Sequence, residues 1–455
     1  MPRPPIPNMT LDQALQALLC VDNEARNAAT EWVDMQREKD APAFCQGLLE
    51  YAALAHVALH IRALAVVLLR RVFILSHLDG NALAPFRPQL VQFLQSLLSN
   101  PQIGDPAEGR NIRFLARKVG DAAAYAAAVT FKSGGTWPEL FQLVGQAAVD
   151  GTSPERRSTG FALLSRLLES GHCTEHLEAA RHQIVQTLLQ GLADPNESVK
   201  EQALHAACRA CTSASALVSF QAALSPLALP LLTLASRSHD SSVLSSLHEA
   251  AEQDPELFGK PRPDEGYNGP QQALQLLGPL VMDEEHEPEF RGGAASLMMR
   301  ILKGAGSKWA KKNLQVFTDA AQLAASLCAA ASDDEWAEWS RRSDEFQDPS
   351  HDISALGKQI SQELLASDNA ALQPALAVAS KLLAPNEQKS WQARLAGLLM
   401  LESVLEANGK GVKPALTEVF RTTLNHMKHD HPRVRWAALG VLSLLCEEFG
   451  PQLQV

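Results

Sequence analysis

The sequence predicts an all-α fold built from repeated pairs of antiparallel helices. Three observations lead to this prediction. Aromatic residues make up only 5% of the chain and Tyr occurs three times, whereas β-strands favour aromatic and β-branched side chains. Alanine and leucine, which favour helix, are abundant. A motif of constant design also recurs along the 455 residues, so the chain need not be divided into separate globular domains.

The recurring motif starts with a short polar turn. An apolar residue, an Arg or Lys, and then small apolar residues at helical spacing follow the turn; the clearest copies lie at 194–200 and 431–435. From Val434, apolar residues follow at offsets of 3, 4, 7, 8 and 11, which is one face of an α-helix. We expect the Arg or Lys to lie at the edge of its repeat and to pair with an acid of the next repeat.

The spacing of the motif identifies the repeat. Steps of 36, 51, 44 and 43 residues separate Arg26, Arg62, Arg113, Arg157 and Lys200. HEAT repeats, pairs of antiparallel helices, recur every ~40–47 residues. The sequence therefore predicts an α-solenoid of about ten HEAT repeats that winds into a right-handed superhelix. Their second helices are expected to begin near Asp22, Val57, Glu108, Ser153, Pro195, Asp240, Glu287, Asp352, Glu387 and His431.

The predicted organisation has three parts. Residues 1–9 contain four prolines and are expected to be a disordered tail. Repeats 1–6 occupy 10–254, and repeats 7–10 occupy 255–455. Because the last repeat ends at Phe449-Gly450 without a polar capping repeat, we expect an array truncated at its C-terminus, one part of a longer solenoid.

Residues 331–352 interrupt the repeat pattern within the eighth repeat. This segment contains Arg341 and Arg342, three aromatic residues including Trp336, and eight acids. The acids are Asp333, Asp334, Glu335, Glu338, Asp344, Glu345, Asp348 and Asp352. One interpretation is a solvated linker, and the other is an acidic arm for a basic partner. The aromatic residues favour the second interpretation, because a spacer does not need them.

Composition and motifs exclude several classes of function. The net charge of -11 argues against direct nucleic-acid binding, which needs a basic surface. No apolar stretch approaches the ~18 residues that span a membrane. Seven scattered cysteines do not form a disulfide framework. No motif of a hydrolase, phosphate loop or metalloprotease is present, so we expect neither an enzyme nor a cofactor.

Two groups of side chains could suggest a metal site. Cys208 and Cys211 lie near His205, but structural zinc needs four ligands and there is no second cysteine pair. The histidines at 426, 429 and 431 match no known ligand pattern. We therefore expect no metal.

Two tryptophans of the last repeats have different predicted roles. Trp391 shares the apolar stripe of its helix, which predicts packing in the core. Trp436 lies off the stripe that starts at Val434. It is either an anchor for a partner on the concave face or a contact with a further repeat.

Several segments resemble importin-β-type (karyopherin-β) nuclear import receptors, and specifically their N-terminal half. The segments DNEARNAATEW at 22–32, IRALAVVLLRRVF at 61–73, IRFLARKVGDAAA at 112–124 and WPELFQLV at 137–144 resemble the N-terminal region of these receptors. Three further segments are similar to the importin-5 branch. They are HDSSVLSSLHEAAE at 239–252, WQARLAGLLML at 391–401 and HPRVRWAALGVL at 431–442.

The resemblance implies a function and an arrangement of sites. Such a receptor is a monomer that shuttles between cytoplasm and nucleus, docks on Phe-Gly nucleoporins, binds basic import signals of cargo such as ribosomal proteins or histones, and releases cargo to RanGTP. The second helices would line the concave face. Basic cargo would bind there from the seventh repeat onward, helped by the acidic loop. RanGTP would bind the first repeats near Glu31, Asp34, Arg113, Arg117 and Asp121.

Two alternatives remain open. A rigid HEAT scaffold would not depend on Ran, but such scaffolds have more uniform repeats and no acidic insertion. An exportin would bind cargo together with RanGTP instead of releasing it. The importin-5-like segments in the middle repeats favour import.

Overall fold

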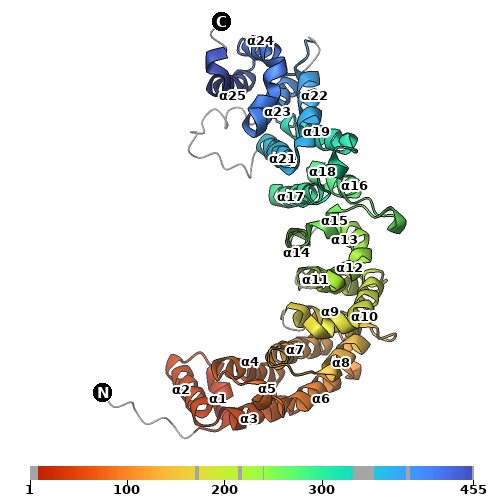
Figure 1. The fold of residues 1–455 in the computed structure, drawn as a ribbon. Helices are drawn as coiled ribbons and strands as arrows, with labels where there is room; N and C mark the ends of the chain where they lie inside the picture. The colour runs from red at the N-terminus through yellow and green to blue at the C-terminus, as the bar shows by residue number, and fades with distance from the viewer. Residues whose placement is uncertain are drawn as a thin grey trace. The chain divides into compact units, whose positions relative to one another are not determined.

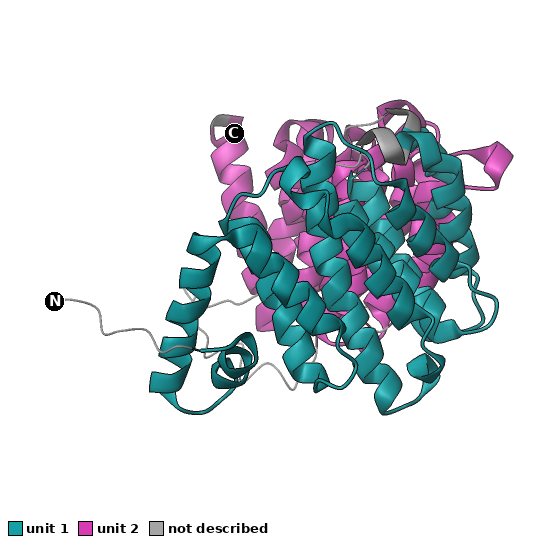
Figure 2. Cartoon of the chain, turned by 90° about the horizontal axis from the view of Figure 1, so that it is seen from below, with its two compact units in different colours: residues 1–227 teal, residues 228–455 magenta. Residues whose placement is uncertain are grey.

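The computed structural model describes residues 9–169, 174–213, 218–238, 240–331, 353–385 and 390–452. These residues form two compact units, 1–227 and 228–455, which are coloured separately in Figure 2. Within the described ranges the secondary structure is helical, apart from an isolated antiparallel bridge between Arg262 and Tyr267. The predicted all-α class is confirmed.

Unit 1 consists of five antiparallel helix pairs (Figure 1). The pairs are α1 (Leu11–Leu18) with α2 (Asn23–Lys39), α3 (Ala41–Ala53) with α4 (Leu59–Leu75), α6 (Phe86–Leu98) with α7 (Glu108–Lys132), α8 (Pro138–Ala148) with α9 (Pro154–Glu169), and α10 (Thr174–Leu192) with α11 (Glu197–Ser213). The short elements are α5 (Gly80–Leu83), η1 (Pro101–Gly104), α12 (Val218–Ala223) and η3 (Ser225–Leu227). Helices α4, α7, α9 and α11 pack side by side as one layer, and α3, α6, α8 and α10 form the other.

Unit 2 repeats this design with five more pairs. They are α13 (Ala228–Ala235) with α14 (Ser241–Gln253), α16 (Gly269–Met282) with α17 (Pro288–Gly304), α19 (Leu314–Cys328) with α21 (Ile353–Ser367), α22 (Leu372–Leu383) with α23 (Trp391–Asn408), and α24 (Leu416–His426) with α25 (Pro432–Phe449). The short elements are α15 (Pro255–Gly259), η4 (Pro263–Glu265), α18 (Ser307–Ala310), η7 (Asn369–Ala371), η8 (Gly409–Ala415) and η9 (Gly450–Gln452). The second helices α14, α17, α21, α23 and α25 pack consecutively.

The ten helix pairs confirm the predicted repeat array. Each second helix begins within four residues of its predicted start, the largest difference being at α23. The starts follow from local chemistry. Asp22 and Asp240 accept hydrogen bonds from backbone N–H groups two residues later, which otherwise have no partner in the first turn. Pro288 and Pro432 occupy first helical positions, where a missing N–H costs nothing.

The core of each unit lies between its two layers of helices. In α25 the predicted stripe is buried at Val434, Ala437, Ala438, Val441 and Leu445. Large side chains fill the interior, and Phe73, Phe161, Phe258 and Phe317 are completely inaccessible to solvent. No helix in the described ranges is both long enough and apolar enough to cross a membrane.

Candidate partner-binding surfaces

The motif arginines mostly bind backbone carbonyls of their own repeat. Arg62 Nε donates to Ala52 O at 2.7 Å, and Arg291 Nε donates to Val281 O at 2.8 Å. Arg113 Nη1 donates to Ile103 O at 2.5 Å. Carbonyls at the end of a helix lack an intrahelical partner and attract cations. The expectation that these arginines pair with an acid of the next repeat is therefore wrong for these three repeats.

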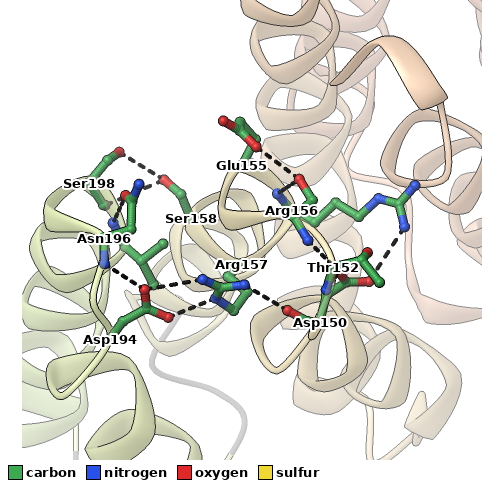
Figure 3. Close-up of polar contacts among 11 residues, drawn as sticks. Asp150, Thr152, Glu155, Arg156, Arg157, Ser158, Asp194, Asn196 and Ser198 are labelled. Carbon is green, nitrogen blue, oxygen red and sulfur yellow. Dashed lines mark hydrogen bonds and ion pairs between the residues drawn. The ribbon is translucent and has the colours of Figure 1, made fainter. Parts of the chain in front are cut away.

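Arg157 does form the expected pair with the next repeat. Its Nε lies 2.7 Å from Asp194 Oδ2 and its Nη2 lies 3.1 Å from Asp194 Oδ1 (Figure 3). Its Nη1 also donates to Asp150 O, at 2.9 Å. Burial acts to raise the pKa of Asp194, but hydrogen bonds from Arg157 and from the N–H of Asn196 outweigh it and lower that pKa. This link fixes the fourth repeat to the fifth.

The residues predicted to contact RanGTP are distributed over two helices. Glu31 and Asp34 lie on α2, where Glu31 is exposed and Asp34 is 3.5 Å from Arg37 Nη2. Arg117 is exposed on α7, and Arg113 of the same helix is held by Ile103. In the described ranges no hydrogen bond or ion pair joins the two α2 residues to the α7 residues. These assignments remain predictions, with Arg113 already serving a structural role.

Asp121, the fifth predicted residue, lines an open hollow on the second-helix layer of unit 1. Nine residues from three helices form this hollow: Arg70 of α4; Asp121, Ala124, Tyr125, Ala128, Val129 and Lys132 of α7; and Arg166 and Glu169 of α9. Asp121 Oδ1 lies 3.3 Å from Arg166 Nε, and Arg166 Nη1 lies 2.8 Å from Glu169 Oε2. We call this site the α4–α7–α9 hollow.

The basic residues of this hollow were not among those predicted from the sequence. Arg70, Lys132 and Arg166 are separated by 62 and 34 residues and lie on three different helices. Only the packing of α4 and α9 on opposite sides of α7 brings them together. The repeat period could have aligned the three helices, but it does not specify which residues of neighbouring helices face each other.

A second polar cluster lies on the second-helix layer of unit 2. Lys358 Nζ of α21 is 3.1 Å from Glu402 Oε2 and 3.5 Å from Glu406 Oε1, and both carboxylates belong to α23. Gln362 Nε2 donates to Glu406 Oε2 at 2.6 Å. Burial raises the pKa of Glu402, while the charge of Lys358 opposes this shift. The cluster thus presents two carboxylates and one ammonium group, with a net negative charge.

The acidic loop precedes α21, the helix that carries Lys358. The seven acids predicted to bind cargo, Trp336, and the eighth acid of the segment, Asp352, all lie in 332–352, outside the described residues. Their assignment remains a prediction.

The tryptophans of unit 2 occupy different environments. The ring of Trp391 stacks on that of His431 in the next repeat, with centroids 3.7 Å apart and an interplanar angle of 3°. Trp391 therefore packs against the next repeat, but it is only partly buried, so its predicted place in the core is not what the structure has. Trp436 on α25 is 39% exposed, and Leu439 near it is 52% exposed. Trp436 is therefore exposed, and its role as an anchor stays a prediction.

The side chains that could suggest a metal site have structural contacts. His426 Nδ1 lies 2.8 Å from Thr422 O, and its Nε2 lies 3.3 Å from Arg394 Nη1. His429 Nδ1 accepts the backbone N–H of His431 at 3.0 Å. Cys208 and Cys211 are buried in α11. The two histidines therefore hold neighbouring helices and a turn together.

Comparison with known proteins identifies the type of repeat. Residues 112–261 match the protein-family model described as "IPO5-like, TPR repeats", and residues 391–445 match one for HEAT-like repeats. Among solved structures, Kap121p bound to RanGTP is similar with a TM-score of 0.71 and 20% identity, over 97% of this chain and 40% of that one. Kap121p bound to Ste12p has a TM-score of 0.76 and 21% identity, over 98% of this chain and 41% of that one. Kap121p bound to Nup53p has a TM-score of 0.75 and the same identity, over the same shares.

These matches confirm the resemblance to importin-β-type receptors of the importin-5 branch and the fold of a karyopherin solenoid. The chain spans about two fifths of the length of the karyopherin structures to which it is similar.

Proposed function

We propose that this chain is the N-terminal part of a nuclear import receptor that binds basic cargo and exchanges it for RanGTP. The observation that carries the proposal is the match of residues 112–261 to the IPO5-like repeats, together with a karyopherin fold over 98% of the chain. The Kap121p structures that share this fold contain RanGTP in one case and the nucleoporin Nup53p in another.

RanGTP binding is assigned to the second-helix layer of unit 1. Asp121 and Arg117 lie on the solvent side of α7 in this layer, and Glu31 and Asp34 lie on α2. The α4–α7–α9 hollow adds three cations beside Asp121. A surface with both signs of charge suits a specific protein partner better than a polyanion, because fixed carboxylates repel a continuous negative charge.

Basic cargo is assigned to the second-helix layer of repeats 7–10. Glu402 and Glu406 supply carboxylates there. The sequence of residues 331–352 contains eight acids, and the proposal gives this segment the same role. An acidic surface attracts Lys- and Arg-rich segments and increases their rate of association. Under this proposal 10–254 serves mainly Ran and 255–455 mainly cargo. Phe-Gly nucleoporins would dock on the first-helix layer, and the receptor would shuttle between cytoplasm and nucleus as a monomer.

The first test is binding of the chain to Ran loaded with GTP and, separately, with GDP. We expect strong preference for the GTP form. A basic peptide is then added to the complex: competition with RanGTP indicates import, whereas joint binding indicates an exportin. Equal binding of both nucleotide forms, or no binding by a folded chain, would reject the receptor function and favour a scaffold.

A further inference from the structure

The α4–α7–α9 hollow exists because small residues form its floor. Ala124 and Ala128 are one helical turn apart on α7 and therefore lie on the same face. Their methyl groups leave space between the long side chains that project from the two neighbouring helices. Arg70 of α4 stands on one side and Arg166 of α9 on the other. The result is a recess with an apolar floor and a polar rim.

The charges of the hollow are only partly paired. Arg166 is occupied by two carboxylates, Asp121 at 3.3 Å and Glu169 at 2.8 Å. Asp121 is also within 4.0 Å of Lys118 Nζ. The exposed Arg70 and Lys132 form no ion pair within the described part of the chain.

Tyr125 lines the same recess, and its hydroxyl can also donate a hydrogen bond. The two exposed side chains of the recess without an ion-pair partner among the described residues, Arg70 and Lys132, are both donors.

We propose that this hollow binds one carboxylate side chain of RanGTP, with Arg70 and Lys132 as its ion-pair partners. The inference rests on the proposed function, because it takes RanGTP as the partner of this layer. A carboxylate fits better than a phosphate group or a nucleic-acid strand, since Asp121 and Glu169 would repel a second negative charge. The methyl groups of Ala124 and Ala128 then contact the aliphatic part of the acidic side chain.

The test is the affinity of the chain for RanGTP after Arg70→Glu and Lys132→Glu. We expect each variant to weaken binding by at least about tenfold, because each places a carboxylate opposite the incoming one. Arg71→Glu is the matched control. Arg71 follows directly on α4 and is exposed, but it does not line the hollow. The control should change affinity by less than about twofold. Circular dichroism checks that all variants are folded.

A variant of the floor distinguishes binding of a carboxylate inside the hollow from long-range electrostatic attraction. Ala128→Leu fills the floor without changing charge, so it should also weaken RanGTP binding. Wild-type affinity for all three hollow variants would overturn the inference and leave the proposed function standing. An equal loss with Arg71→Glu would also overturn it, because the effect would then be general electrostatics. If the wild-type chain does not bind RanGTP at all, the proposed function fails and the inference fails with it.

Discussion

Arg157 and Asp194 form a two-pronged ion pair that joins the fourth repeat to the fifth, with N–O distances of 2.7 and 3.1 Å. The Asp194 side chain is 9% exposed and that of Arg157 is 17% exposed. Asp194 also accepts the N–H of Asn196 at 2.9 Å, which shapes the turn before α11. One carboxylate thus orders its own turn and ties it to the preceding helix pair (Figure 3).

We expect Asp194→Ala to lower the free energy of unfolding by about 3 kcal/mol, because it leaves a largely buried guanidinium group without its anion. In a repeat protein this loss should be local. Hydrogen exchange should therefore accelerate in α9 and α11 more than in α2, and the midpoint of urea denaturation should fall.

The control for this variant is an ion pair in the same region that is open to solvent. Glu197 Oε1 lies 2.6 Å from Lys200 Nζ, but the Glu197 side chain is 84% exposed. Glu197→Ala should therefore change stability by less than about 1 kcal/mol. Equal effects of the two variants would contradict the structural role of the Arg157–Asp194 pair.

A second prediction concerns acid stability. Burial acts to raise the pKa of Asp150, but hydrogen bonds from Thr152, Ser153 and Arg156 outweigh it and lower that pKa to about 2. A carboxyl group whose pKa is lower in the folded state stabilises the fold above its unfolded pKa, here 3.8. This contribution is lost as the pH falls from about 4 to about 2.

Asp150→Asn removes the titrating group while keeping an oxygen acceptor. Between pH about 4 and about 2, the free energy of unfolding of this variant should change by about 2 kcal/mol less than that of the wild-type chain. Urea denaturation at several pH values measures this difference. Parallel pH profiles for the two proteins would show that Asp150 does not have the proposed low pKa.

The fold could be predicted from the sequence because each repeat carries its own signals. An apolar stripe at helical spacing predicts each second helix, and Asp or Pro at its start predicts where it begins. The partners of the motif arginines could not be predicted in the same way. Arg62 and Arg157 occupy equivalent places in the motif, and both donate to a backbone carbonyl of their own repeat, yet only Arg157 also binds an acid of the next repeat. Whether a motif arginine binds an acid of the next repeat depends on which acceptors lie within its reach once the helices have packed.

For the candidate sites, too, single residues could be predicted from the sequence but their neighbours could not. Asp121 could be identified as a polar residue on a second helix, and the structure places it in a hollow. Lys132 lies on the same helix as Asp121, but Arg70 and Arg166 come from helices two repeats apart in the sequence, so their position beside Asp121 is visible only in three dimensions. The same holds for Lys358 and Glu402, whose helices pack together although 44 residues separate them.

A third prediction follows from the Lys358 cluster. If basic cargo binds Glu402 and Glu406, it must compete with the ammonium group of Lys358, which already lies 3.1 and 3.5 Å from their oxygens. Lys358→Met should therefore raise the affinity for a fluorescent Lys-rich peptide about fivefold, which corresponds to about 1 kcal/mol. Glu406→Gln should lower it. Fluorescence anisotropy measures both effects.

Lys303→Met is the matched control for this prediction. Lys303 is an exposed lysine on α17 of the same unit, so the variant makes the same change in net charge away from the cluster. It should affect peptide affinity by less than about twofold. Equal gains from the two lysine variants would mean that net charge alone governs binding. No gain from Lys358→Met would argue against cargo contact with these carboxylates.

The last prediction concerns the close packing of helices within the fourth repeat. A Cβ atom at Gly160 of α9 would lie 2.4 Å from the backbone N of Ala148 in α8. Because the obstacle is backbone, Gly160→Ala forces the two helices apart and should cost at least about 2 kcal/mol of stability. Gly145 of α8 has no atom within 4 Å of its Cβ position. Gly145→Ala should instead stabilise the helix by about 0.5–1 kcal/mol. The midpoint of urea denaturation should therefore fall for Gly160→Ala and rise for Gly145→Ala. Midpoints that shift in the same direction would contradict the packing of α8 on α9.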